Sequence, residues 1–183
     1  MNALVVLADG FEDIEAVTVI DVLRRGRVDV VTASLSGTPI VKSAHGMEML
    51  ADLPFEKAAE DSYSAIILPG GGGGTENMKR SPALIERLRR QKGEGGLICA
   101  ICAAPTVLVD ADVLDPEQHV TCYPSCVMDL DRPSANVPVV ADGNVITGQA
   151  PGSALLFSLV VLKALAGDKS AEKVARGMVT DVL

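Results

Sequence analysis

Runs of consecutive apolar residues alternate with amphipathic segments along most of the chain. Short apolar runs bounded by turn residues are typical of strands that are buried on both faces of a sheet. The segment from Ile14 to Arg25 has a helical period instead, with Ala16, Ile20 and Leu23 on one face. It lies between two apolar runs, and this strand, helix and strand form a βαβ unit, which predicts a parallel sheet.

The same alternation continues to the end of the chain. The predicted strands are residues 3–8, 28–34, 65–69, 96–101 and 144–148, with a hairpin or irregular strands in residues 37–52. The predicted helices are residues 14–25, 82–91, a segment after Cys102, 152–166 and 171–182. One doubly wound α/β domain over residues 1–183, with helices on both faces of a mainly parallel sheet, accounts for this order.

Composition and charge narrow the class of protein. The 183 residues are 48% apolar and 22% charged, which is a globular composition, and only 3% are aromatic, so the core must be aliphatic. The net charge of −8, with no basic block, argues against binding to nucleic acid. We find no secretory signal at the N-terminus, and the apolar segment 154–166 is too short to span a bilayer. We therefore expect a cytoplasmic protein that does not bind membranes.

Three polar or glycine-rich loops follow predicted strands, at residues 9–15, 70–75 and 102–105. Ligands of doubly wound proteins bind outside the carboxyl ends of the strands, so these loops are candidates for a shared site.

The four cysteines allow several kinds of chemistry, because a cytoplasmic location argues against structural disulfides. Cys99 and Cys102 have the spacing of a redox pair, although Cys99 falls inside an apolar strand. With Cys122 and Cys126 they also have a tolerable zinc spacing. A buried apolar cysteine is a third interpretation, which suits Cys99 and also Cys126.

Cys102 fits a fourth interpretation, a nucleophile at a sharp strand-to-helix turn. Small residues, Ala100 and Ala104, lie two positions before and after it, as the tight turn of a nucleophile elbow requires. The following helix favours a thiolate by up to about 2 kcal/mol. Lowering a thiol pKa by three units needs roughly 4 kcal/mol, so a further hydrogen-bond donor is needed.

Glu15, just beyond the first predicted strand, is the candidate for that donor. A protonated Glu15 could donate to the Cys102 thiolate, whereas an ionised Glu15 would raise the thiol pKa. The alternative is that Glu12, Asp13 and Glu15 only favour the start of a helix.

Four segments occur in order along nearly the whole chain: LADGFEDIEAVTVIDVLRRG, AIILPGGGGG, GLICAICAAP and APGSALLF. Together they resemble the ThiJ/PfpI superfamily and, within it, the DJ-one branch. The resemblance implies a flavodoxin-like fold and a homodimer. It implies that Cys102 is a reactive, peroxide-sensitive cysteine and that Glu15 is its protonated partner. It also places Gly70 and Gly71 beside the sulfur, where the Gly71 and Ala103 amides can form an oxyanion hole.

The resemblance further implies a cysteine-dependent activity on reactive carbonyls that requires neither a metal nor an organic cofactor. The substrates would be methylglyoxal, converted to lactate, or early glyoxal adducts of proteins, with a role in protection from oxidative stress. The alternative is a redox sensor or stress chaperone whose Cys102 is oxidised to a sulfinate, with little catalysis.

The chain departs from its relatives at two positions near Cys102. Ala103 stands where the protease-like branch has histidine, which argues against peptidase activity. Tyr123 stands where many DJ-one relatives have histidine, and a phenol is a poor base but a sound hydrogen-bond donor. Of the two histidines, His45 lies near a position where relatives have arginine and could reach the partner subunit's site, whereas His119 is expected to be an ordinary surface residue.

Overall fold

The computed structural model describes residues 1–181, and its centre is a seven-stranded sheet in the order β5-β2-β1-β6-β7-β9-β8. The strands are β1 Asn2–Leu7, β2 Asp29–Ser34, β3 Ile40–Lys42, β4 Glu48–Leu50, β5 Leu53–Pro54, β6 Ala65–Leu68, β7 Leu97–Ile101, β8 Val139–Asp142 and β9 Val145–Gly148. All neighbours in the large sheet are parallel except β8, which runs antiparallel to β9. A separate antiparallel pair, β3 and β4, confirms the predicted hairpin.

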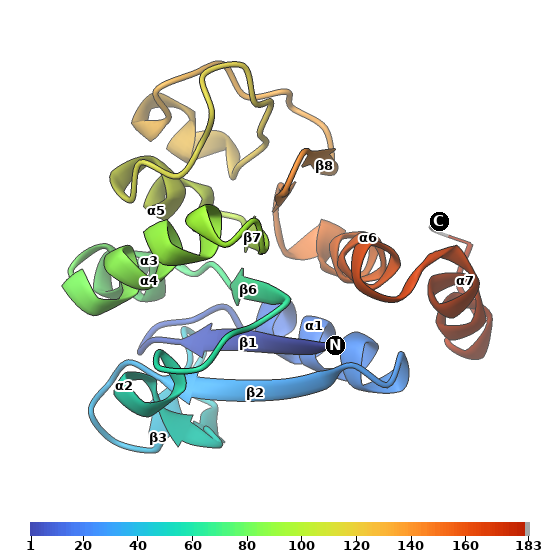
Figure 1. Ribbon diagram of the computed structural model, residues 1–183, viewed down its shortest axis with the longest axis horizontal. Coiled ribbons are helices and arrows are strands. Elements are labelled where there is room, and N and C mark those ends of the chain that lie inside the picture. Colours follow the sequence, from blue (N-terminus) through green and yellow to red (C-terminus); the bar gives the residue numbers. More distant parts are fainter. Residues whose placement is uncertain (182–183) are drawn as a thin grey trace.

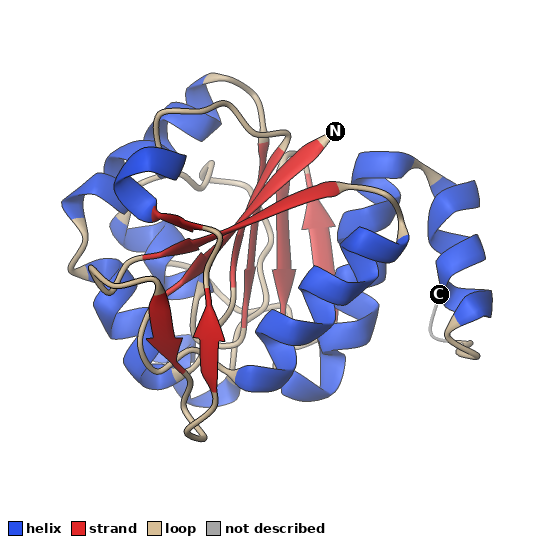
Figure 2. Cartoon of the chain, turned by 90° about the horizontal axis from the view of Figure 1, so that it is seen from below, coloured by secondary structure: helices blue, strands red, loops and turns tan. Residues whose placement is uncertain are grey.

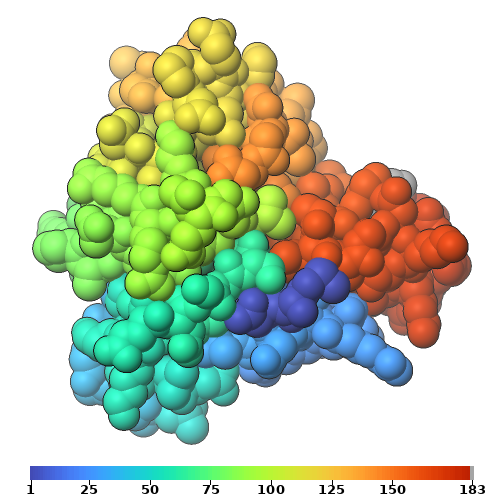
Figure 3. Space-filling model, in the orientation of Figure 1, coloured from blue at the N-terminus to red at the C-terminus, as the bar shows by residue number. Residues whose placement is uncertain are grey.

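Helices cover both faces of the sheet, as Figures 1 and 2 show. The α-helices are α1 Asp13–Arg25, α2 Phe55–Ala58, α3 Gly72–Lys79, α4 Pro82–Gly93, α5 Pro105–Asp110, α6 Ala154–Ala166 and α7 Asp168–Gly177; the 3-10 helices are η1 Pro124–Asp129 and η2 Pro151–Ser153. On one face α1 and α6 pack against the sheet and α7 packs against α6, and α2 to α5 pack on the other face. Figure 3 shows the C-terminal helices beside the N-terminal segment at the surface.

Strand β1 explains why the sheet has two cores. Its alternate side chains point to opposite faces, and Val5 lies in one core while Leu4 and Val6 lie in the other, all fully buried. The expected doubly wound α/β architecture is therefore confirmed. The strand order reverses between β1 and β6, which is where ligands of such folds bind.

Several predicted boundaries differ from the structure. The glycine-rich segment was expected to be a loop, but Gly72 begins the helix α3. The first turn of this helix lies close to the loop after β1. A Cβ on Gly74 would lie 3.0 Å from Phe11 Cα, so a larger residue would push these two segments apart. The antiparallel strand β8 was not predicted, since its residues are only half-buried or exposed. The last helix, predicted at residues 171–182, spans Asp168–Gly177, and Val182 lies outside the described residues.

Candidate active site

Cys102 lies in the turn between β7 and α5 and has a left-handed backbone, with a φ of 66°. Its N–H donates to Gly148 O on the neighbouring strand at 3.0 Å, and its carbonyl accepts a hydrogen bond from Tyr123 N–H at 2.7 Å. Such a backbone is strained for a residue other than glycine and persists only where its surroundings fix it. The sharp strand-to-helix turn predicted from the small neighbours of Cys102 is therefore present.

The three predicted loops meet at Gly70. Its N–H donates to Glu15 Oε2 at 2.7 Å, and its carbonyl accepts from Glu12 N–H at 3.0 Å. A Cβ on Gly70 would lie 2.6 Å from Cys102 Cβ and 2.8 Å from Glu15 Oε2. Glu15 reaches this place from the first turn of α1 and is only 1% exposed. The carboxyl group and the thiol are thus brought together across a position where only glycine fits.

Two backbone amides also face the sulfur. The N–H groups of Gly71 and Ala103 interact with Cys102 and lower the pKa of its thiol. Gly71 has a φ of 89°, and a Cβ there would meet Gly10 O and would lie 2.7 Å from Glu12 N, so the loop depends on glycine at this position. Two amides converging on one atom have the arrangement of an oxyanion hole.

Burial shifts the pKa values of both side chains upward. It raises the pKa of Glu15 to about 7, against the lowering effects of the Gly70 N–H and the Cys102 thiol. Burial also raises the pKa of Cys102 to about 12, and the negative charge of Glu15 adds to this increase. The interpretation of Cys102 as a nucleophile required a lowered thiol pKa, whereas the pKa is raised, because Cys102 is only 8% exposed.

A proton can nevertheless move within this pair without a change in net charge. A thiol beside a carboxylate and a thiolate beside a carboxylic acid each carry one negative charge. The Gly71 and Ala103 amides favour the form with its charge on sulfur. Glu15 Oε1, which is buried without a hydrogen-bond partner, is the oxygen available to hold the proton.

The raised pKa of Glu15 predicts how stability depends on pH. The carboxyl group ionises from a pKa of 4.5 in the unfolded chain but only near 7 in the folded one. The folded state therefore binds more protons between these values, and the free energy of unfolding falls as the pH rises through this window. Gln does not titrate. The free energy of unfolding of Glu15→Gln should therefore increase relative to that of the wild type as the pH rises from 4.5 to 7, by roughly 3 kcal/mol in total.

Urea unfolding of the two proteins at pH 4.5, 6 and 8 measures this difference. Glu172→Gln, at an exposed position of α7, is the matched control and should show no such trend. A constant difference between Glu15→Gln and wild type over the whole pH range would contradict the raised pKa.

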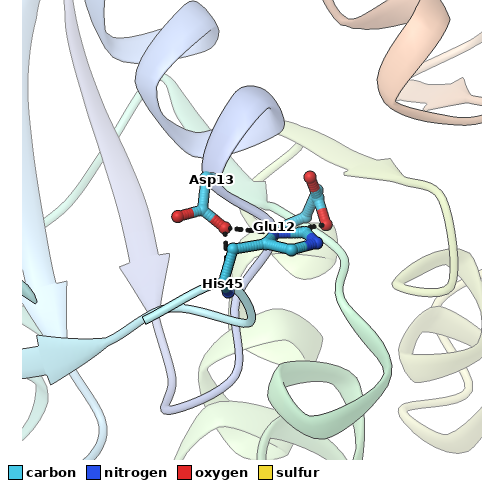
Figure 4. A group of neighbouring side chains, drawn as sticks. All are labelled: Glu12, Asp13 and His45. Atoms are coloured by element: carbon cyan, nitrogen blue, oxygen red, sulfur yellow. Dashed lines mark hydrogen bonds and ion pairs between the residues drawn. The ribbon is translucent and has the colours of Figure 1, made fainter. Parts of the chain in front are cut away.

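His45 lies beside the start of α1, where its ring contacts two acidic side chains (Figure 4). Its Nδ1 is 2.8 Å from Asp13 Oδ2 and 3.8 Å from Glu12 Oε2. The hydrogen bond to Asp13 raises the pKa of His45. Burial raises the pKa of Asp13, but the hydrogen bonds from Ser43 and His45 outweigh this effect, so the pKa of Asp13 is lowered. We missed this contact, because nothing local links His45 to acids that lie more than thirty residues earlier.

The remaining candidates are placed as follows. Tyr123 is 42% exposed and touches the site through its backbone N–H, which binds the Cys102 carbonyl. Cys99 is fully buried inside β7, where burial raises the pKa of its thiol, so it is ill suited to be the exposed partner of a redox pair. His119 is exposed, with Nδ1 3.0 Å from Asp142 Oδ2.

One set of side chains within residues 1–181 could hold a metal ion. Glu12, Asp13 and His45 have their ligand atoms within 4.8 Å of one another, and no other group of three in this range does. This set contains no cysteine, so the zinc interpretation of the four cysteines is not supported. None of the helices in residues 1–181 combines the length and the apolar character needed to cross a membrane.

These features define a flavodoxin-like α/β protein with a cysteine at a strained turn beside a buried carboxyl group. The DJ-1/PfpI family model matches residues 1–164, and the chain belongs to this family. It is 40% identical over 180 residues to Protein dj-1beta of Drosophila melanogaster, covering 97% of this chain and 96% of the relative.

Two further comparisons concern activity and structure. The chain is 34% identical over 170 residues to the Glutathione-independent glyoxalase DJR-1.2 of Caenorhabditis elegans, covering 91% of this chain and 89% of the relative. The structure of oxidized Toxoplasma gondii DJ-1 is similar, with a TM-score of 0.94, 32% identity and 98% of each chain covered. The expected superfamily and flavodoxin-like fold are thus confirmed.

Proposed function

We propose that the protein is a cysteine-dependent enzyme that acts on reactive carbonyls without a cofactor, converting methylglyoxal to lactate or removing early glyoxal adducts. The observation that carries this proposal is the convergence of the Cys102 thiol, the Glu15 carboxyl group and the Gly71 and Ala103 amides on one point. The glyoxalase activity in the name of the Caenorhabditis elegans relative supports the substrate class.

The reaction begins when the proton of Cys102 passes to Glu15. The thiolate adds to the aldehyde carbon, and the new oxyanion is stabilised by the Gly71 and Ala103 amides until Glu15 protonates it. Glu15 then removes the hydrogen of the former aldehyde carbon, which gives an enediolate, and returns a proton at the former ketone carbon, while the hydroxyl proton passes from the former aldehyde oxygen to the former ketone oxygen. This leaves a lactate thioester on Cys102, which water hydrolyses. One methylglyoxal and one water give one lactic acid.

Lactate formation by the purified protein tests the proposal directly. The alternative, a redox sensor or stress chaperone with little catalysis, is favoured by the same geometry, because Glu15 and the two amides could also hold a sulfinate on Cys102. The similar Toxoplasma gondii DJ-1 structure is that of an oxidized protein. A protein that forms no lactate yet gains two oxygens on Cys102 under mild peroxide would fit the sensor and not the enzyme.

We propose that the active form is a homodimer. Exposed apolar side chains gather on α1 and the β3–β4 hairpin: Ile14, Val17, Ile40, Met47 and Leu50. Between them is a cavity of about 320 Å³ lined by Val17, Met49 and Leu50. An unpaired charge buried at such a contact costs several kcal/mol. The contact also lies next to His45, which could reach the partner subunit's site.

A cytoplasmic location also remains a prediction.

Leu50→Asp should therefore convert the dimer to a monomer at micromolar concentration, with an affinity loss of at least about a hundredfold. Sedimentation velocity measures this change. The control is Met128→Asp, since Met128 is 90% exposed in η1, away from the proposed contact, and should leave the dimer intact. A Leu50→Asp protein that remains dimeric would place the interface elsewhere.

A further inference from the structure

Cys122 and Cys126 lie on either side of residues 123–125. The first of these, Tyr123, binds the carbonyl of Cys102 through its backbone N–H. We propose that these two cysteines form a reversible disulfide when the protein is exposed to a peroxide, and that this bond changes the reactivity of Cys102 through Tyr123. The proposed reaction on carbonyls does not use either thiol, so this would be a second oxidation site.

Cys122 and Cys126 both donate a hydrogen bond to the same backbone oxygen. The Cys122 thiol donates to Tyr123 O at 3.3 Å, and the Cys126 N–H donates to the same oxygen at 2.8 Å. Burial raises the pKa of Cys122, and the charge of Cys126 raises it further, as expected for neighbouring sulfurs. Cys126 lies in the 3-10 helix η1, which has no buried residue, and Cys122 lies two residues before this helix, so a disulfide would close a single surface turn.

The two sides of the sheet decide which sulfurs can pair. Cys122 is buried in the core under α2 to α5, and Cys126 packs against the same core. Cys102 belongs to the core on the opposite face. The structure therefore favours a bond between Cys122 and Cys126 over one from either of them to Cys102.

Exposure sets the order of the chemical steps. Cys126 is half-buried and Cys122 is 1% exposed, so the peroxide meets Cys126 first. The Cys126 thiolate attacks a peroxide oxygen, the O–O bond breaks, and a sulfenic acid and one water form. Cys122 then attacks the Cys126 sulfur, the S–S bond forms, and the second water leaves. Two thiols and one hydrogen peroxide thus give one disulfide and two waters, and an added dithiol reverses the bond.

The position of Tyr123 explains why this bond would reach the candidate active site. Cys122 and Cys126 enclose the segment of residues 123–125. A disulfide would draw the two ends of this segment together, and we expect this to move the Tyr123 amide. That amide holds the carbonyl of Cys102 at 2.7 Å and so helps to fix its strained turn. We therefore expect the alkylation rate of Cys102 to change severalfold when the disulfide forms.

Digestion with the protease Asp-N isolates the pair, because the peptide of residues 115–128 contains Cys122 and Cys126 and no other cysteine. After mild peroxide, this peptide should lose two hydrogen atoms in wild type and in Cys102→Ala, and dithiothreitol should restore them. Two free thiols after a treatment that oxidises Cys102, or a bond from Cys126 to Cys102, would overturn the proposal.

Cys126→Ser is the matched variant for the second half of the proposal, because this half-buried position tolerates a small polar side chain. The iodoacetamide labelling rate of the remaining Cys102 thiol is measured before and after the same peroxide treatment. The rate should change in wild type and stay constant in Cys126→Ser. An equal change in both proteins would show that the disulfide does not act on Cys102.

Discussion

Replacement of Cys102 by alanine is expected to abolish lactate formation from methylglyoxal, with a loss of at least roughly a thousandfold. The reason is that the carbonyl carbon has no other nucleophile within the strained turn, and Glu15 and the two amides have no covalent intermediate to act on. Cys102→Ser should remain near the alanine level, since a hydroxyl beside Glu15 is a far weaker nucleophile than a thiolate.

Lactate measured over time for wild type, Cys102→Ala and Cys102→Ser is the test. Cys126→Ser is the control for general effects of removing a thiol, and it should keep wild-type turnover. If the alanine variant forms lactate at the wild-type rate, Cys102 does not carry the reaction, and the carbonyl activity needs another origin.

The turn at Cys102 could be predicted because it depends on local sequence. Ala100 and Ala104 are small where a sharp strand-to-helix turn leaves no room, and this requirement is visible in a few consecutive residues. Glu15 was found for a related reason, as an acid in the first helical turn directly after a strand. The doubly wound sheet followed from apolar runs that alternate with helical periods.

Features that depend on contacts between distant segments could not be predicted in the same way. The helix α3 begins within a run of glycines, against their helix propensity, because Gly74 packs on Phe11. The burial of Cys102, which raises its pKa, results from the assembly of loops after β1, β6 and β7. Sequence shows which residues meet at the strand ends, but the amount of water they exclude is a property of the whole fold.

Glu15→Gln should separate the two effects that this carboxyl group has on Cys102. Removing its negative charge lowers the pKa of the thiol, because the charge of Glu15 helps to raise that pKa in wild type. Turnover of methylglyoxal should still fall by about a hundredfold or more, the usual size of a general acid–base contribution. The variant would thus have more thiolate at neutral pH and less activity.

Thiolate absorbance against pH and lactate formation, measured on the same preparations, give the two quantities. Glu15→Asp is the matched variant, since it still titrates but reaches less far, and its turnover should lie between wild type and Glu15→Gln. If Glu15 only favours the start of α1, both variants lose some stability and keep their turnover, and Glu15 then has no part in the reaction. A fall in turnover of this size together with a lower thiol pKa would point to the loss of proton transfer, because more of the Cys102 sulfur is then present as the thiolate.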